Sequence, residues 1–392
     1  MNRVGVGVLV TTVMTVTTLM QFALGALGPT LLTELDLSRF GLGALSGVYY
    51  LVAAVCSPLL GRLIDRVPAR VSITVLLVSA GVAYLLTALA PAYAWLFPGL
   101  VLAGAAAAAG NPATNLVLAD IPPPRGAIVG IKQSGVQVGA LIAGAALPPL
   151  AVGAGWRAAF LACAVVAALA LPMTAWLPRH PRLRDPVPDE GREALPHAVQ
   201  RLTAYAFCMG AGMATVTTYL ALYGHERAGL APGPAGLLLA VIGASAVGAR
   251  IGWSVLAERR RTTHEGIPGA LAVMALLATT ATVLVALAAA AGVWALWLAA
   301  LVFGFSGAAW NGVAMLTVIH IAPPLDTARA SGRVLAGFFT GLCGTPLVFG
   351  ALVDATGTYL SGWTLTALMF AAAMAVAAGR PRRWGATATR SA

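Results

Sequence analysis

The fold of this chain is decided by a short basic stretch, Gly61-Arg62-Leu63-Ile64-Asp65-Arg66-Val67-Pro68-Ala69-Arg70. It separates two runs, 41–61 and 71–90, that contain no charged residue. Each run has the length of about 20 residues that a helix needs to cross the hydrocarbon core of a bilayer. The stretch therefore predicts a short cationic loop between two transmembrane helices.

The same alternation of apolar runs and short polar breaks extends along all 392 residues. Apolar residues make up 59% of the chain and charged residues 9%, whereas soluble domains carry about 25% charged residues. This composition excludes an ordinary cytosolic enzyme, a disordered protein and a secreted disulfide scaffold. It predicts an all-α integral membrane protein with twelve spans, at 5–33, 41–61, 71–90, 94–118, 127–150, 157–178, 201–224, 234–256, 266–290, 293–319, 329–352 and 360–379.

The first span has the position of a signal peptide, which is the alternative to a retained helix. The charged region before it contains only Arg3, and the apolar stretch is longer than the apolar core of a signal peptide. We therefore expect a retained first transmembrane helix.

The basic residues predict the orientation. With the N-terminus inside, 18 of the 24 basic residues fall in cytoplasmic segments, three in outer loops and three within spans. Cytoplasmic loops of membrane proteins are enriched in Lys and Arg. We therefore expect both termini in the cytoplasm, which requires an even number of spans. The membrane that the chain crosses is expected to be the cytoplasmic membrane. The net charge of +11 reflects this topology, and no nucleic-acid partner is expected.

The longest polar segment lies halfway along the chain and predicts two halves. We expect a six-helix bundle over 1–178, a cytoplasmic linker over 179–200, a second bundle over 201–379 and a cytoplasmic tail over 380–392. Asn111 and Asn311 stand 200 positions apart, as do the Pro-Pro pairs at 123–124 and 323–324. Internal duplication explains this constant offset, and chance matching in an Ala/Gly-rich sequence is the alternative.

The stretch at 61–70 resembles the loop signature of the major facilitator superfamily. Gly61, Leu63, Asp65, Arg66 and Arg70 match it, whereas Pro68 stands where the family usually has Gly, and Ala69 where it has a basic residue. A degenerate copy follows the eighth span, at 254–260. The resemblance implies two six-helix bundles related by pseudo-two-fold symmetry, with a solute carried between them by alternating access.

The resemblance also implies a cytoplasmic gate. It assigns gating roles to Gly61, Asp65, Arg66 and Arg70 in the first copy, and to Glu258 and Arg259 in the second. For the loop charges, the alternative is a purely topogenic role. We expect Arg250 to pack at this gate, and substrate contact is the alternative for that residue.

Ionisable residues within the spans indicate what the cavity binds. All thirteen acidic residues fall in loops or near span ends, although a cation in a low-dielectric cavity needs an anionic partner. Lys132, the only lysine, and Arg333 lie at similar depths in spans five and eleven. They are predicted to bind an anion between them. Alternatively, they extend to the membrane surface or pair with Asp120 and Asp326.

Uncharged polar residues on the spans that would line the cavity complete the candidate site. Each is a candidate for a hydrogen bond to the solute, and an interhelical contact is the alternative. They are Gln21, Asn111, Asn115, Gln133, Gln137, Trp310 and Asn311.

These features predict a secondary transporter for a small organic anion such as a carboxylate. The alternative is a proton-coupled efflux antiporter for drugs or amphiphilic metabolites, because Gly135, Gly139 and Gly144 in span five partly match the antiporter motif of the resembled family. Proton coupling through the substrate or His320 is a further hypothesis. We find no nucleophile–base constellation, metal-ligand spacing or phosphate-binding loop in the sequence. No enzymatic activity, metal or cofactor is therefore expected, and we expect a monomer in the lipid bilayer.

Overall fold

The computed structural model describes residues 3–64, 66–119, 126–177, 195–259, 266–321 and 327–379. Twelve segments within these ranges are long and apolar enough to cross a membrane, which confirms the predicted number. Most of the described charged residues lie in loops or near helix ends, because a charged group in hydrocarbon is costly. Most of the predicted linker and the whole predicted tail lie outside the described residues.

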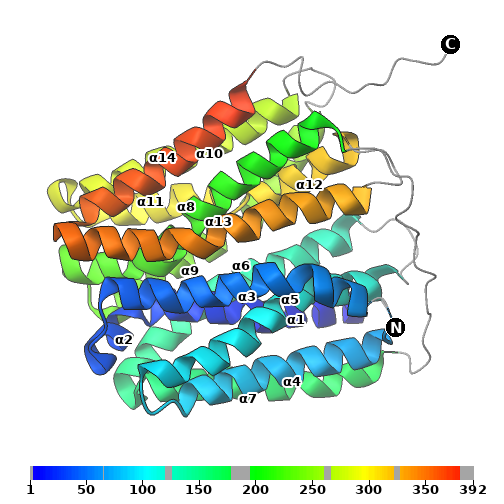
Figure 1. Ribbon diagram of the computed structural model, residues 1–392, viewed down its shortest axis with the longest axis horizontal. Coiled ribbons are helices and arrows are strands. Elements are labelled where there is room, and N and C mark those ends of the chain that lie inside the picture. Colours follow the sequence, from blue (N-terminus) through cyan, green and yellow to red (C-terminus); the bar gives the residue numbers. More distant parts are fainter. Residues whose placement is uncertain are drawn as a thin grey trace.

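The first half of the chain forms one group of helices, in the lower part of Figure 1. Its elements are α1 (Arg3–Ala26), α2 (Gly28–Leu35), α3 (Arg39–Ile64), α4 (Ala69–Ala88), the short 3-10 helix η1 (Tyr93–Trp95), α5 (Leu96–Ala119), α6 (Gly126–Ala154), α7 (Trp156–Ala170) and the 3-10 helix η2 (Leu171–Trp176).

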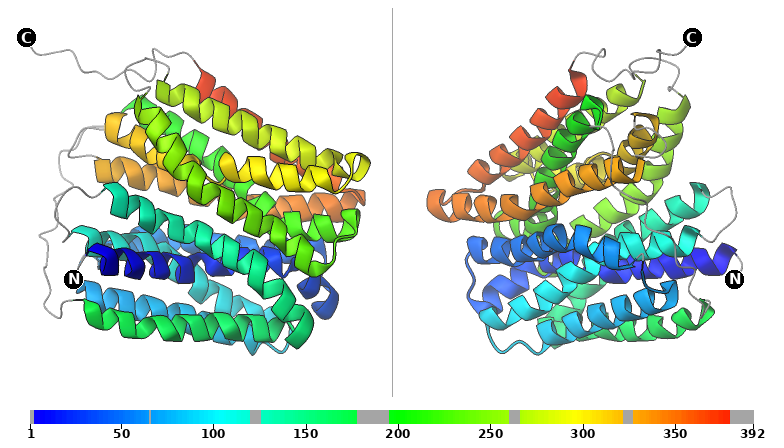
Figure 2. Two further views of the ribbon diagram at one scale, coloured as in Figure 1. Left: turned by 180° about the vertical axis from the view of Figure 1, so that it is seen from behind. Right: turned by 45° about the vertical axis from the view of Figure 1, so that its right-hand side comes forward.

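The second half forms the upper group in Figure 1, and the views in Figure 2 show the same division. Its elements are α8 (His197–Ala228), α9 (Pro232–Arg259), α10 (Gly266–Ala291), α11 (Trp294–Phe305), α12 (Trp310–Ile321), α13 (Thr327–Thr356) and α14 (Tyr359–Ala378).

Two predicted spans are interrupted rather than continuous. The span predicted at 5–33 divides at Leu27 into α1 and α2, because Pro29 has no backbone N–H and favours the start of a new helix. The span predicted at 293–319 breaks between α11 and α12, where residues 306–309 form turns. Ser306 and Gly307 occupy this break, and such pairs are common causes of helix interruption.

The two halves are in close contact at one end of the molecule, which we call the far end. The start of α1 and the end of α14 lie at the other end, which we call the terminal end (Figure 1). There α3 packs on α13, and α6 packs on α9. A Cβ atom on Gly43 would overlap the backbone of Pro346, and one on Gly144 would overlap the backbone of Gly236 and Ala240. Small residues allow this approach of helix backbones within a membrane.

Toward the terminal end α13 diverges from α3 (Figures 1 and 2). A Cβ atom added to Gly61 of α3 would meet nothing within 4 Å there. The contact between α6 and α9 extends further, because Arg250 of α9 donates to the Gln133 carbonyl of α6. The halves are therefore tightly packed at the far end, and α3 and α13 separate toward the terminal end.

Candidate solute-binding cavity

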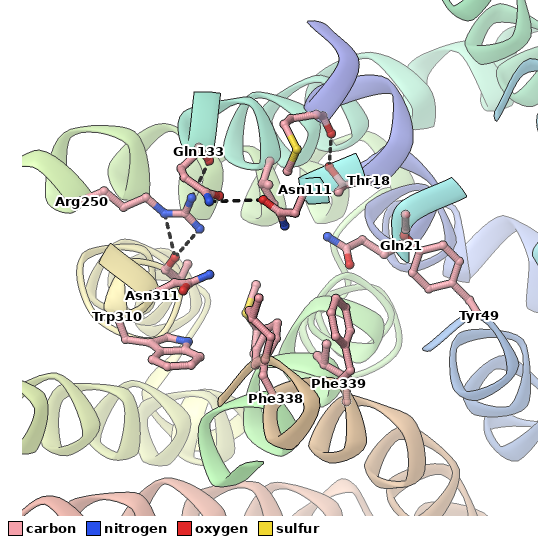
Figure 3. A pocket seen from close by; sticks show the side chains of 17 residues that line it. Thr18, Gln21, Tyr49, Asn111, Gln133, Arg250, Trp310, Asn311, Phe338 and Phe339 are labelled. Carbon is pink, nitrogen blue, oxygen red and sulfur yellow. Dashed lines mark hydrogen bonds between the residues drawn. The ribbon is translucent and has the colours of Figure 1, made fainter. Parts of the chain in front are cut away.

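A cavity lies between the two halves, about midway along α1 (Figure 3). It is bounded by α1, α3, α5 and α6 of the first half, and by α8, α9, α12 and α13 of the second. The lining side chains are Met14, Thr18, Gln21, Tyr49, Ala107, Asn111, Gln133, Val136, Met213, Arg250, Ala308, Trp310, Asn311, Leu335, Phe338, Phe339 and Leu342.

The first half contributes a wall of amide side chains. The Asn111 Oδ1 atom accepts hydrogen bonds from Lys132 Nζ at 3.0 Å and from Gln133 Nε2 at 3.3 Å. Both contacts go to the same oxygen, so the amide nitrogen of Asn111 remains available as a donor for a solute. We refer to the amide residues Gln21, Asn111 and Gln133, together with the neighbouring hydroxyl residue Thr18, as the amide wall (Figure 3).

Lys132 lies behind this wall. Its side chain is 1% exposed, and its ammonium also donates to Asn115 Oδ1 at 2.6 Å. It therefore does not extend to the membrane surface. No carboxylate pairs with it among the described residues, and Asp120 and Asp326 lie outside them. Two amide oxygens thus solvate a buried cation that burial alone would disfavour.

Arg250 is the only ionisable cation among the described lining residues, and it joins the two halves. Its Nη1 donates to the Gln133 carbonyl of α6 at 2.5 Å, and its Nη2 donates to the Ala308 carbonyl at 3.2 Å. The Ala308 carbonyl also accepts from Gln137 Nε2 of α6 at 3.3 Å. This carbonyl is available because it lies in the break between α11 and α12, outside the regular helical hydrogen bonds.

The break also places the first residues of α12 in the cavity. Trp310 and Asn311 both line it, and Asn311 Oδ1 is buried without a hydrogen-bond partner within the described part of the chain. The N-terminus of a helix carries a partial positive charge. In many transporters, such interrupted helices direct their N-terminal ends at the substrate site.

The second half contributes an aromatic wall, which we define as Trp310, Phe338 and Phe339. The rings of Trp310 and Phe338 are 5.4 Å apart and edge-on, and those of Phe338 and Phe339 are 5.7 Å apart. Tyr205 supports Trp310 from behind at 5.6 Å. In Figure 3 the aromatic wall faces the amide wall across the cavity, with Arg250 and Asn311 at one end.

A family model described as Major Facilitator Superfamily matches residues 10–283, well over half of the chain. The chain belongs to the major facilitator superfamily.

Solved structures agree with this membership at the level of the fold. A bacterial homologue of the human lysosomal transporter Spinster, in an inward-facing and unoccupied conformation, gives a TM-score of 0.79 at 17% identity over 97% of each chain. Its inward-facing and occupied conformation gives 0.77 at 16% identity, over 96% of this chain and 94% of that one. The nucleoside transporter NupG gives 0.74 at 15% identity, over 96% and 98%. No curated protein sequence matches significantly.

In this major facilitator, most of the candidate binding residues gather at the cavity. Gln21, Asn111, Gln133, Trp310 and Asn311 line it directly. Lys132 lies beside it and contacts the lining residue Asn111, and Gln137 contacts the Ala308 carbonyl. Asn115 contacts Lys132. Binding of a solute by these residues stays a prediction.

Arg333 lies elsewhere. Successive helical residues are rotated by about 100°, which puts Arg333 on the face of α13 opposite Leu335 and Leu342, both of which line the cavity. Its side chain is exposed. Lys132 and Arg333 therefore do not face each other in this structure, and Arg250 is the cation at the cavity.

The predicted cytoplasmic gate lies partly outside the described residues. Asp65 falls outside them, as do the side chains of Glu258 and Arg259 at the end of α9. Arg66 is exposed, Arg70 is half-buried, and the space beside Gly61 is open. The gating roles of these residues stay predictions, and Arg250 is the gating candidate that contacts both halves.

Phe338 and Phe339 were not predicted from the sequence as lining residues. A period of 3.6 residues from Leu335 to Leu342 indicates one apolar face, but every span of this chain is rich in apolar residues. A polar cluster at the far end was not predicted either, because its members lie far apart in the sequence.

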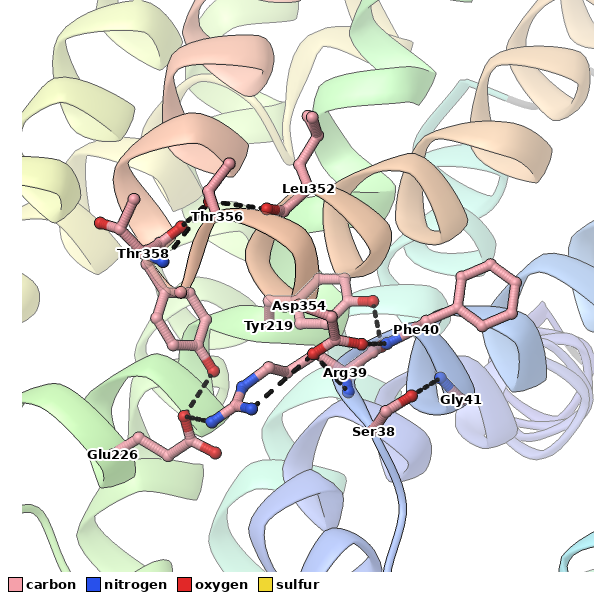
Figure 4. Close-up of polar contacts among 12 residues, drawn as sticks. Ser38, Arg39, Phe40, Gly41, Tyr219, Glu226, Leu352, Asp354, Thr356 and Thr358 are labelled. Carbon is pink, nitrogen blue, oxygen red and sulfur yellow. Dashed lines mark hydrogen bonds and ion pairs between the residues drawn. The ribbon is translucent and has the colours of Figure 1, made fainter.

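That far-end cluster links the two halves (Figure 4). Arg39 of α3 forms ion pairs with Glu226 of α8 at 2.7 Å and with Asp354 of α13 at 3.7 Å. The Asp354 carboxylate also accepts the Phe40 backbone N–H at 2.8 Å. Tyr219 Oη donates to the Arg39 carbonyl at 2.7 Å. We call Arg39, Tyr219, Glu226 and Asp354 the far-end cluster.

Proposed function

We propose that this major facilitator is a secondary transporter that moves a small organic anion, such as a carboxylate, across the cytoplasmic membrane by alternating access. The observation that carries the proposal is the charge around the cavity. Arg250 lines it and Lys132 lies behind Asn111, while no carboxylate is among the described lining residues.

The loss of hydration determines which charge this cavity accepts. A cationic solute taken into a low-dielectric cavity loses its hydration and needs an anionic partner. The described lining residues offer amides, a guanidinium and aromatic rings. All three nitrogens of the Arg250 guanidinium donate to the Ala308 or Gln133 carbonyl, so Arg250 favours an anion chiefly through its positive charge, and amide donors add hydrogen bonds. An anionic solute therefore satisfies this cavity better than a cationic one.

We also propose that the terminal end faces the cytoplasm. The 18 basic residues of the predicted cytoplasmic segments support this orientation. With that orientation, the close packing at the far end and the separation at the terminal end describe an inward-facing carrier. Residues of the cavity act by binding rather than by catalysis, and a proton gradient is the proposed energy source.

The second candidate is an efflux antiporter for amphiphilic compounds. The aromatic wall and the neighbouring Met14 and Met213 favour it, because they give the cavity a large apolar surface. The two candidates differ in the charge they require, since drug antiporters of the cationic type need a carboxylate in the cavity.

The test is counterflow in liposomes that contain the purified protein. The probes are lactate and benzoate as acids, benzamide as a neutral compound and benzylamine as a cation, with protein-free liposomes as the leak control. We expect exchange of at least one acid, no exchange of benzylamine, and loss of acid exchange in Arg250→Gln. Exchange of benzylamine without exchange of either acid would favour the efflux antiporter. An imposed pH gradient that fails to drive acid accumulation would exclude proton coupling.

A further inference from the structure

We infer that the preferred solute is an anion with a flat, apolar body, such as an aromatic carboxylate, rather than a short hydrophilic acid. This inference rests on the proposed anion transport and narrows its substrate class. It follows from the arrangement of the aromatic wall opposite the amide wall.

The aromatic wall offers ring surface directly to the cavity. Phe338 and Phe339 are only half-buried although they lie between the two halves of the protein, and both line the cavity together with Trp310. Their edge-on and tilted contacts with one another leave part of each ring without an aromatic partner. A flat ring placed there gains aromatic contacts beyond those of simple burial.

Leu335 and Leu342 extend this apolar surface along α13, and Met213 of α8 adds to it. A two- or three-carbon acid has no group large enough to cover this surface. Bound alone, it would leave the apolar wall in contact with water, and the apolar contribution to binding would be lost.

The polar atoms of the cavity require that the solute is not wholly apolar. Asn311 Oδ1 and the Tyr49 hydroxyl are buried at the cavity without hydrogen-bond partners in the described ranges. Tyr49 is 1% exposed. The Asn111 amide nitrogen also faces the site, because Lys132 and Gln133 occupy the amide oxygen. Buried polar groups without partners are costly, so a solute with polar groups at its edge is favoured.

The solute class then follows from the aromatic wall, the amide wall and the end of the cavity with Arg250. The acid group lies toward the end with Arg250, and the flat body lies on the aromatic wall. Polar substituents face the amide wall and the unpartnered groups of Tyr49 and Asn311. Ring and charge are both required, so a solute that lacks either loses one set of contacts.

The experiment separates the contribution of the ring from that of the charge by measuring how four probes bind to the purified protein. Calorimetry at neutral pH gives the dissociation constants of benzoate (ring and charge), lactate (charge alone), benzamide (ring alone) and lactamide (neither). We expect benzoate to bind about tenfold more tightly than each of the others. Phe339→Leu and Phe338→Leu are expected to weaken benzoate binding about three- to tenfold and to leave lactate binding unchanged. Phe305→Leu, at an exposed residue of α11 outside the cavity, is the matched control.

The outcomes distinguish this inference from the proposed function. If lactate binds as tightly as benzoate and both amides bind weakly, the anion proposal stands and the inference is overturned. If benzamide binds as tightly as benzoate, the anion proposal fails, and the inference fails in its requirement for charge. If none of the four probes binds, the inference is also overturned. Phe338 packs beside Gly210, so Phe338→Leu also changes a structural contact. Phe339→Leu and the melting temperature of each variant therefore show whether a loss of benzoate binding reflects the missing ring.

Discussion

The guanidinium of Arg39 lies 2.7 Å from the carboxylate of Glu226, and this contact joins the start of α3 in the first half to α8 in the second. Residues 187 positions apart in sequence are thus paired at the closed end of the molecule. The pair is partly exposed, so it contributes only about 0.2–1 kcal/mol by itself. Its importance lies in its position, since every conformation in which the far end opens must break it.

Substitution of Arg39 by Gln is expected to favour opening of the far end. The change removes both ion pairs of the far-end cluster, and about 1 kcal/mol corresponds to roughly a fivefold shift in a two-state equilibrium. Cys343 reports the change, because it lies where α13 packs on α3, with its Sγ 3.8 Å from the Gly47 carbonyl. In a variant with the other three cysteines replaced by Ser, we expect Cys343 to react about two- to fivefold faster with a maleimide.

Arg157→Gln is the control for this measurement. Arg157 donates to the Ala90 carbonyl within the first half and makes no contact across the halves in the described structure. An equal acceleration of Cys343 labelling in both variants would contradict a role for the far-end cluster in closure.

Substitution of Gly144 by Val is expected to prevent close packing of α6 on α9. The added side chain would overlap the backbone of Gly236 and Ala240, and a helix backbone cannot retreat without separating the two halves. We expect transport to fall more than tenfold. Gly153→Val on the same helix is the control, since its Cβ atom would meet nothing within 4 Å. Transport by both variants at the parental rate would show that this approach of backbones is dispensable.

Substitution of Lys132 by Met is expected to weaken solute binding indirectly. Met has nearly the volume of Lys but donates no hydrogen bond, so Asn111 loses the shorter of the two contacts that fix its amide orientation. The dissociation constant of the transported acid should rise about five- to tenfold, as expected for loss of a charge-assisted hydrogen bond. Asn115→Leu, which removes the other partner of Lys132, should give a smaller rise. An unchanged dissociation constant in Lys132→Met would contradict this positioning role.

Substitution of Arg333 by Gln is expected to leave solute binding unchanged. The side chain is exposed on the face of α13 opposite the cavity-lining residues Leu335 and Leu342. Calorimetry with the same acid, beside Arg250→Gln, measures the contrast directly. A loss of binding in Arg333→Gln comparable to that in Arg250→Gln would restore the pairing of Lys132 with Arg333 that the sequence predicts.

Much of the fold could be predicted from the sequence because the bilayer imposes a simple rule. Charges are rare within the spans, so Arg62, Arg66 and Arg70 mark the boundary between α3 and α4, and uncharged runs mark helices. The helix breaks could not be predicted in this way. Ser306 and Gly307 lie within a long apolar run, and hydropathy does not distinguish an interrupted helix from a continuous one.

The candidate site was only partly predictable for a related reason. Polar residues such as Asn111 and Gln133 are rare within spans and therefore stand out. Phe338 and Phe339 do not, because an aromatic residue in a span faces lipid as readily as a cavity. Arg333 and Lys132 share a similar depth in sequence, but the helix rotation that separates them depends on packing between helices, which periodicity in a uniformly apolar span does not fix.

The Ala308 carbonyl accepts hydrogen bonds from Gln137 of one half and Arg250 of the other. Arg250 also donates to the Gln133 carbonyl of α6. Any sliding of α6 against the second half must therefore rearrange the Gln137–Ala308 and Arg250–Gln133 contacts in the same event. The contact between α6 and the second half beside the cavity should therefore open as a unit rather than bond by bond. Movement of the unwound turn at 306–309 would also shift Trp310 and Asn311. Rearrangement of the contact between α6 and the second half therefore alters the shape of the solute site at the same moment.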